Sequence, residues 1–154
     1  MDLEFTALCR AFVALVLSGV LGWERETAGK SAGVRTHMLV GLASALFVVL
    51  GDLFVVRFAD HGEKMRFDPI RIIEAVVSAI GFLGAGTIFV SKGRDRVRGL
   101  TTAASILVTA GVGMTVGLGN YVLALGVTVL VLGVLHGMPF LKEKDARGSE
   151  QEND

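Results

Sequence analysis

Cysteine is nearly absent from this sequence, because Cys9 is the only one among 154 residues. A lone cysteine excludes an internal disulfide and any metal site built from several cysteines, and its apolar surroundings indicate a small packing residue. An excess of charge of one sign is absent too, since 15 basic residues balance 15 acidic ones. The chain therefore offers no general basic surface, and we expect no nucleic-acid partner.

Long apolar runs, by contrast, dominate the sequence. Hydrophobic residues make up 52% of it and the mean hydropathy is +0.62, above the usual range of soluble domains. A helix needs about 20 mostly apolar residues to cross a bilayer, and five such runs leave no amphipathic helices to cover a soluble core. We predict an all-α membrane protein, a compact bundle of five transmembrane helices surrounded by lipid. The expected spans are Phe5–Trp23, Thr36–Val56, Ile70–Val90, Leu100–Leu118 and Asn120–Met138.

Charged and turn residues mark the ends of these spans. Asp68 is a good helix cap and is followed by Pro69, which suits a first helical turn. Asp2 and Glu4 precede the first run where a signal peptide would carry positive charge, so we expect that run to remain as a span. Near Gly119 only a tight antiparallel turn fits between the last two spans. Without that turn the count falls to four spans.

The distribution of basic residues predicts the orientation. Lysine and arginine total ten in the first and third loops and after Met138, whereas the second and fourth loops together contain four, all of them in the second. Because cytoplasmic loops carry the basic excess, we expect the N-terminus outside and the C-terminus in the cytoplasm. Residues 1–141 should form the transmembrane domain, and the charged segment 142–154 a disordered tail.

Small residues recur four positions apart within the spans, a spacing that lets helix backbones approach closely in lipid. The pattern predicts tight packing within a protomer or between protomers of a homo-oligomer. The run Gly81–Gly86, which includes Gly84, is denser than packing requires and indicates a locally loosened helix whose carbonyls face a cavity. The pairs are Ser18 with Gly22, Gly41 with Ala45, Gly81 with Ala85, Gly113 with Gly117, and Gly133 with Gly137.

An ionisable residue within the third span is the first candidate for function. Charged groups at membrane depth are costly and usually serve a purpose. Glu74 shares one helix face with a hydroxyl and small residues, a stripe that suits a cation path. The alternative is that Glu74 pairs with Arg71 or Arg10 near the outer interface, where Asp52 also belongs. The stripe consists of Glu74, Ser78, Gly81 and Ala85.

A second polar cluster lies where the first span ends and the second begins. Carboxylates at a helix C-terminus face the negative end of the helix dipole, so Glu24 and Glu26 need compensation. Arg35, a neighbouring helix N-terminus or a bound cation each provides it. With threonine hydroxyls and water, these carboxylates suit Mg²⁺, and ordinary ion pairing is the alternative. The cluster contains Glu24, Arg25, Glu26, Arg35, Thr36 and His37.

Neither a zinc site nor a catalytic site is predicted. His37, His61 and His136 are too scattered in this topology to bind one zinc ion. No serine, histidine and acidic residue are arranged for nucleophilic catalysis. We expect that the protein is not an enzyme and has no cofactor, with Mg²⁺ as the one candidate ligand.

Five short blocks of sequence, in a fixed order over about residues 20 to 120, carry a family resemblance. They are Gly22–Glu26, Ala32–Val40, Asp68–Ile72, Gly81–Ile88 and Gly99–Ser105. Together they resemble the signature blocks of the MgtC/SapB family of bacterial inner-membrane proteins. The resemblance implies a compact multi-span domain, growth at low magnesium and, in pathogens, survival inside macrophages. It further implies regulation of membrane energetics, with the proton-driven ATP synthase as a partner.

The resemblance also implies which residues matter, and it has departures. Where the family has a polar residue, a glycine and a tryptophan, this chain has Ala75, Ala79 and Leu107. We expect the transmembrane domain alone, without the soluble C-terminal domain of the virulence-type members. The implied signature residues are Glu24, Arg25, Glu26, Arg35, Thr36, His37, Asp68, Arg71, Thr101 and Thr102.

Three hypotheses for function follow. The first is an inner-membrane protein that influences magnesium homeostasis or membrane energetics by contacting another membrane protein. The second is a Mg²⁺ transporter or channel, with helix-three residues lining the path and Glu24 and Glu26 at its inner mouth. The third is a scaffold subunit that binds no ligand.

Overall fold

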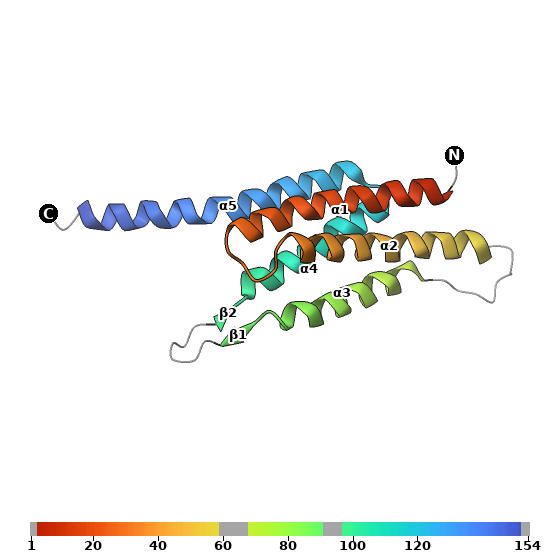
Figure 1. Cartoon of the computed structure of the whole chain (residues 1–154), viewed down its shortest axis with the longest axis horizontal. Coiled ribbons are helices and arrows are strands. Elements are labelled where there is room, and N and C mark those ends of the chain that lie inside the picture. The colour runs from red at the N-terminus through yellow and green to blue at the C-terminus, as the bar shows by residue number, and fades with distance from the viewer. Residues whose placement is uncertain (1–2, 59–67, 91–96, 152–154) are drawn as a thin grey trace.

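The structure of the protein is a computed structural model that describes residues 3–58, 68–90 and 97–151. Helices form nearly all of it (Figure 1). The five described helices confirm the predicted all-α bundle. Two antiparallel strands of two residues each separate the third helix from the fourth, with Phe89 opposite Arg98. The elements are α1 (Leu3–Thr27), α2 (Val34–Phe58), α3 (Pro69–Ala85), β1 (Phe89–Val90), β2 (Val97–Arg98), α4 (Leu100–Gly117) and α5 (Tyr121–Gln151).

Helices α1, α2 and α4 pack against one another and form the centre of the bundle. Helix α5 lies along α1 and α4, whereas α3 lies at the edge, on α4 and less closely on α2 (Figure 1). Within the described residues, α1, α4 and the Val34–Arg57 part of α2 are long and apolar enough to cross a membrane. Tyr121–His136 of α5 is a shorter apolar stretch.

Small residues hold the central helices together, as predicted. A Cβ atom added at Gly113 would meet the carbonyl oxygen of Gly41 and lie 2.9 Å from its Cα. One added at Gly41 would lie 2.6 Å from Cβ of Ser18, and one at Gly117 would lie 2.9 Å from the oxygen of Ala45. Side chains at these positions would push the backbones apart, so three of the predicted pairs pack within the protomer.

The small residues of α3 and α5 behave differently. A Cβ atom added at Gly81, Gly126 or Gly133 would meet nothing within 4 Å. Gly81 and Gly133 belong to two of the predicted pairs, and neither packs against another helix of the protomer. Gly137 lies outside the residues whose side chains are described. These surfaces are therefore free for lipid or another protein.

Helix α3 ends five residues earlier than predicted, at Ala85 rather than Val90. The glycines of the Gly84–Gly86 segment are poor helix formers, and Thr87 closes the end by donating from Oγ1 to the Gly84 carbonyl at 2.7 Å. The chain then extends into β1. Gly99, with φ of +93°, follows β2 against the carbonyl of Thr87, where only glycine fits. The end of the glycine run, Gly84–Gly86, therefore terminates the helix.

The other boundaries follow the expected pattern with one difference at the C-terminus. Gly119, at φ +82°, makes the predicted tight turn between α4 and α5. The α5 backbone continues through residues 142–151, where we expected a disordered tail. Lysine, arginine, glutamate and glutamine make up most of that segment and are good helix formers, which accounts for the continuation. The division into domain and tail stays a prediction.

The basic segments meet at one end of the bundle. The α1–α2 loop, strands β1 and β2 and the C-terminal end of α5 lie at the end opposite the start of α1 (Figure 1). Lys30 and Arg98 are exposed there. This arrangement agrees with the predicted grouping of basic residues, and the assignment of that end to the cytoplasm stays a prediction.

Candidate functional site

A buried ion pair lies at the end of α1. The Arg25 guanidinium donates from Nε and Nη2 to the two carboxylate oxygens of Glu24, with 2.6 Å between Nη2 and Oε1. Arg25 is 3% exposed and Glu24 is 8% exposed, so the pair is largely removed from solvent. A two-contact arginine–carboxylate pair of this kind satisfies both charges. The ordinary ion-pairing alternative therefore holds for Glu24, with Arg25 as its partner.

Glu26 is compensated by the next helix. Its Oε2 accepts a hydrogen bond of 2.8 Å from the backbone N–H of Val34, the first residue of α2. Glu26 lies in the last turn of α1, at the negative end of that helix dipole. Its carboxylate compensates for this by binding the positive end of the α2 dipole. Gly33 makes this contact possible, because a Cβ atom there would collide with the Glu26 carboxylate. Of the predicted sources of compensation, the neighbouring helix N-terminus is correct here.

His37 joins α2 to α4 in the same region. It is fully buried; Nδ1 lies 2.9 Å from the Gly33 carbonyl and Nε2 lies 3.3 Å from Ser105 Oγ. Because a carbonyl only accepts, Nδ1 carries a hydrogen. The Ser105 hydroxyl is also 2.8 Å from the Thr102 carbonyl, so it connects His37 to the first turns of α4. Ser105 stands in the Gly99–Ser105 block, but sequence reasoning did not single it out as a site residue.

The cluster is smaller than the one predicted. The buried residues of the cluster come from α1, α2 and α4. The charges of Arg25 and Glu24 lie close enough to the His37 ring to interact with it electrostatically. Arg35 and Thr101 are exposed and Thr36 is half-buried, so they surround the cluster without belonging to it. The interior members are Glu24, Arg25, His37, Thr102 and Ser105.

The two carboxylates proposed as Mg²⁺ ligands already have protein partners. Among the described residues, no group of three or more histidine, cysteine, aspartate or glutamate side chains is close enough to hold a metal ion. His136 is exposed on α5, and His61 lies outside the described residues. A Mg²⁺ ion at Glu24 and Glu26 would displace Arg25 and the Val34 N–H. That site stays a prediction, and the geometry favours ion pairing.

The α3 stripe faces away from the bundle. Glu74, Ser78, Gly81 and Ala85, which share one face of α3, are exposed. The opposite face packs inward, where Val76 is buried and an added Cβ at Gly84 would lie 3.5 Å from Cβ of Ala103 on α4. The stripe therefore faces away from the other helices described, rather than into a cavity between them.

The partner predicted for Glu74 is wrong. Arg10 Nη1 lies 3.4 Å from the Asp52 carboxylate and 2.8 Å from the Gly117 carbonyl at the end of α4. Arg10 thus ties α1 to α2 and α4, where it also meets the negative end of a helix dipole. Glu74 and Arg71 form no ion pair with each other or with any other described residue. The sequence shows which helix carries each charge, but it does not show which charged residues of different helices face each other, and this explains the error.

The remaining α3 candidates have structural roles. Asp68 caps the helix, since its Oδ1 accepts a 3.0 Å hydrogen bond from the Ile70 N–H. Pro69 follows at the first helical position, as predicted. Gly86 ends the helix, donating its N–H to the Phe82 carbonyl at 3.2 Å. Asp68 and Gly86 therefore define the two ends of α3.

A bundle of apolar helices with a buried polar cluster at one end defines a multi-span membrane protein. The model of the MgtC family matches residues 12–144, and the chain belongs to that family. It is 42% identical over 145 residues to YhiD of Escherichia coli K12, whose name describes a proposed magnesium transporter; the match covers 91% of this chain and 64% of YhiD. It is a bacterial inner-membrane protein.

Two further relatives, from other bacteria, match most of this chain. The chain is 40% identical over 132 residues to the protein MgtC of Brucella abortus strain 2308, a match that covers 86% of this chain and 50% of that protein. It is 37% identical over 143 residues to SrpB of Synechococcus elongatus, with 86% of this chain and 75% of SrpB covered. The chain thus spans less than two thirds of the length of YhiD and half that of the Brucella protein. No solved structure matches it.

Proposed function

We propose that this protein serves magnesium homeostasis in the inner membrane by contacting another membrane protein through the outward face of α3. The magnesium link is supported by the family and by the name of the relative YhiD. The contact surface is inferred from the structure. A second copy, or a different membrane protein such as the ATP synthase, would cover the same face.

The exposed carboxylate of Glu74 carries the proposal. Glu74 lies in the second turn of α3 without an ion-pair partner among the described residues. A charge that faces lipid is costly, so such residues are rare unless a partner or water meets them. One and two turns further along α3, Ser78 and Gly81 leave space for the close approach of another helix, since nothing lies within 4 Å of a Cβ built at Gly81. The face has the composition of an interhelical contact.

Transport is the second candidate function. Its path would lie along the α3 stripe that contains Glu74 and Ser78. The backbones of α1, α2 and α4 are in close contact at Gly41, Gly113 and Gly117, so we place no path among these helices. A path lined by Glu74 and Ser78 would need another copy to enclose it. Transport through this stripe therefore also depends on assembly through α3.

Two matched substitutions test the proposed contact. Gly81→Leu fills the α3 face, and Gly126→Leu places the same side chain on α5, where a Cβ also meets nothing within 4 Å. Each is expressed in a strain that lacks the gene and needs it at limiting magnesium. We expect Gly81→Leu to lose growth while both proteins stay folded. Full growth of Gly81→Leu would overturn the proposed contact.

A flux measurement separates regulation from transport. Wild-type protein and Glu74→Gln are reconstituted alone in vesicles loaded with a fluorescent magnesium indicator. Regulation by contact predicts no magnesium entry above protein-free vesicles. Entry that Glu74→Gln removes would instead support the transporter.

A further inference from the structure

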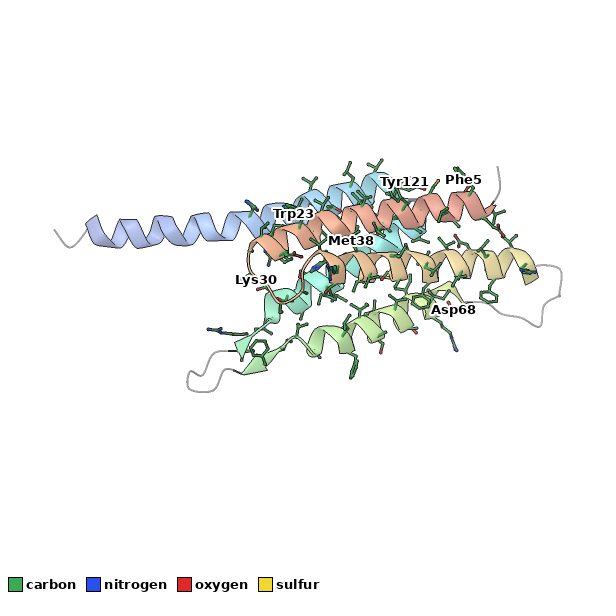
Figure 2. All side chains as sticks on the ribbon, viewed as in Figure 1. Phe5, Trp23, Lys30, Met38, Asp68 and Tyr121 are labelled. Carbon is green, nitrogen blue, oxygen red and sulfur yellow. The ribbon has the colours of Figure 1, made fainter. Side chains whose placement is uncertain are left out.

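A groove of about 650 Å³ runs between α2 and α3 at the end of the bundle near Asp68 (Figure 2). Its walls are apolar, with Phe47, Leu50 and Phe54 from α2 facing Ala75 and Ala79 from α3. All five are exposed, so the groove opens sideways rather than into the protein interior. In a bilayer this opening faces the lipid. None of the functions discussed above uses this groove.

The groove matches the length of one lipid tail. Its α3 wall extends from Asp68 to Ala79, which corresponds to about 17 Å at 1.5 Å per residue. One leaflet contributes about half of a hydrocarbon core of about 30 Å. An acyl chain that enters from the Asp68 end would therefore lie against the groove along most of its leaflet. The small side chains of Ala75 and Ala79 leave the width for it.

The mouth of the groove carries one positive and one negative side chain. Arg71 and Asp68 both line it, and both are exposed. The Arg71 guanidinium has no hydrogen bond or ion pair with another described residue. Asp68 uses Oδ1 to cap α3, and its second oxygen has no such bond to a described residue. The two side chains form no ion pair with each other.

We propose that this groove binds a phospholipid with an amine-bearing zwitterionic headgroup, of the phosphatidylethanolamine class. The acyl chain occupies the apolar groove, Arg71 binds the phosphate and Asp68 accepts hydrogen bonds from the ammonium group. Arginine suits phosphate because its planar fork donates two hydrogen bonds. A helix from a second copy would fit the apolar walls but would leave the two opposite charges without matched partners. The headgroup matches both.

Competition among lipids tests the proposal. Delipidated protein is mixed with equal amounts of phosphatidylethanolamine, phosphatidylcholine and phosphatidylglycerol with identical chains, and retained lipid is counted by native mass spectrometry. We expect phosphatidylethanolamine to be retained about tenfold or more over the others, which is the lower end of what one hydrogen bond to a charged group contributes. Phosphatidylcholine lacks N–H donors, and phosphatidylglycerol lacks the ammonium.

Four variants assign the contacts. Arg71→Gln should lower retention of all three lipids. Asp68→Asn, which keeps a good helix cap, should abolish the preference for phosphatidylethanolamine over phosphatidylglycerol. Leucine at both Ala75 and Ala79 should exclude every lipid without touching a charge. Arg57→Gln removes an exposed arginine near the same end that does not line the groove, and it should change nothing.

Two results would overturn the proposal. One is that the wild type retains the three lipids equally, so that Asp68→Asn, unfolding at the wild-type temperature, changes no preference. The other is that leucine at Ala75 and Ala79 dissociates a dimer while lipid retention is unchanged, which would assign the groove to a second copy. Both are independent of the α3 outer face that contains Glu74.

Discussion

The central helices and α3 use small residues in opposite ways. In α1, α2 and α4, glycines bring backbones together, and the polar groups of Glu24, Arg25 and His37 are buried and paired. In α3, Gly81 is open and Glu74 has no ion-pair partner among the described residues. The same residue types therefore build the fold in one region and leave a surface available in the other. Substitutions should affect stability in the first region and function in the second.

Breaking the buried ion pair should have the largest effect. Arg25→Gln leaves the Glu24 carboxylate buried without its counter-charge, and we expect it to lower the free energy of unfolding by about 3 kcal/mol or more. Chemical denaturation in mild detergent measures this. Arg35→Gln, at an exposed position next to the cluster, should change it by less than about 0.5 kcal/mol. Equal effects of the two substitutions would contradict the buried pair.

Glycine to alanine substitutions compare the two regions directly. At Gly113 the added methyl group meets the backbone of Gly41, so the helices must separate at a cost of about 1–3 kcal/mol. At Gly81 the methyl group enters open space, and the higher helix propensity of alanine should stabilise the protein by up to about 1 kcal/mol. The same denaturation experiment gives both values. Destabilisation by Gly81→Ala in the isolated protomer would show that α3 packs more closely than described.

Removing the cap of α2 should have a smaller, local effect. Glu26→Ala deletes the acceptor of the Val34 N–H, and we expect a loss of about 1 kcal/mol. Hydrogen exchange of the Val34 amide should accelerate, while that of residues in α5 does not change. Glu26→Gln keeps an acceptor oxygen and should fall between alanine and the wild type. Unchanged exchange at Val34 in Glu26→Ala would exclude the cap.

Glu74→Gln should have the smallest effect on stability. The side chain is exposed and forms no ion pair with a described residue, so the expected change in detergent is within about 0.5 kcal/mol. Its effect should instead be seen in growth at limiting magnesium, where the contact partner is present. Strong destabilisation of the isolated protein would place Glu74 in the fold rather than on a contact surface.

Local sequence signals predicted the helices well and the contacts between them less well. The apolar runs predicted five helices, Asp68 with Pro69 predicted the start of α3, and Gly119 predicted the last turn, because each depends on neighbouring residues alone. The end of α3 was placed too late, since a run of apolar residues does not distinguish helix from the short strand at Phe89. The Arg10–Asp52 pair joins residues 42 positions apart, and no periodicity within one helix reveals it.

The candidate site shows the same limit. Sequence reasoning found that Glu24 and Glu26 need compensation, because the helix dipole acts locally. It did not determine that Arg25 would pair with Glu24 and that Val34 would pair with Glu26, since both choices depend on how the α1–α2 loop folds. Nothing local to Ser105 marks it as a site residue, because a serine in an apolar helix usually bonds to its own backbone. Its second contact, with His37, arises only when α2 packs on α4.

The most direct test of the α3 contact is crosslinking in membranes of cells grown at limiting magnesium. A photoreactive amino acid is placed at Ser78, on the proposed contact face, and in a second protein at Val122, which is 89% exposed on α5. We predict that Ser78 crosslinks to a polypeptide, that Gly81→Leu abolishes this product, and that Val122 gives lipid adducts. Lipid adducts alone at both positions would contradict the proposed contact.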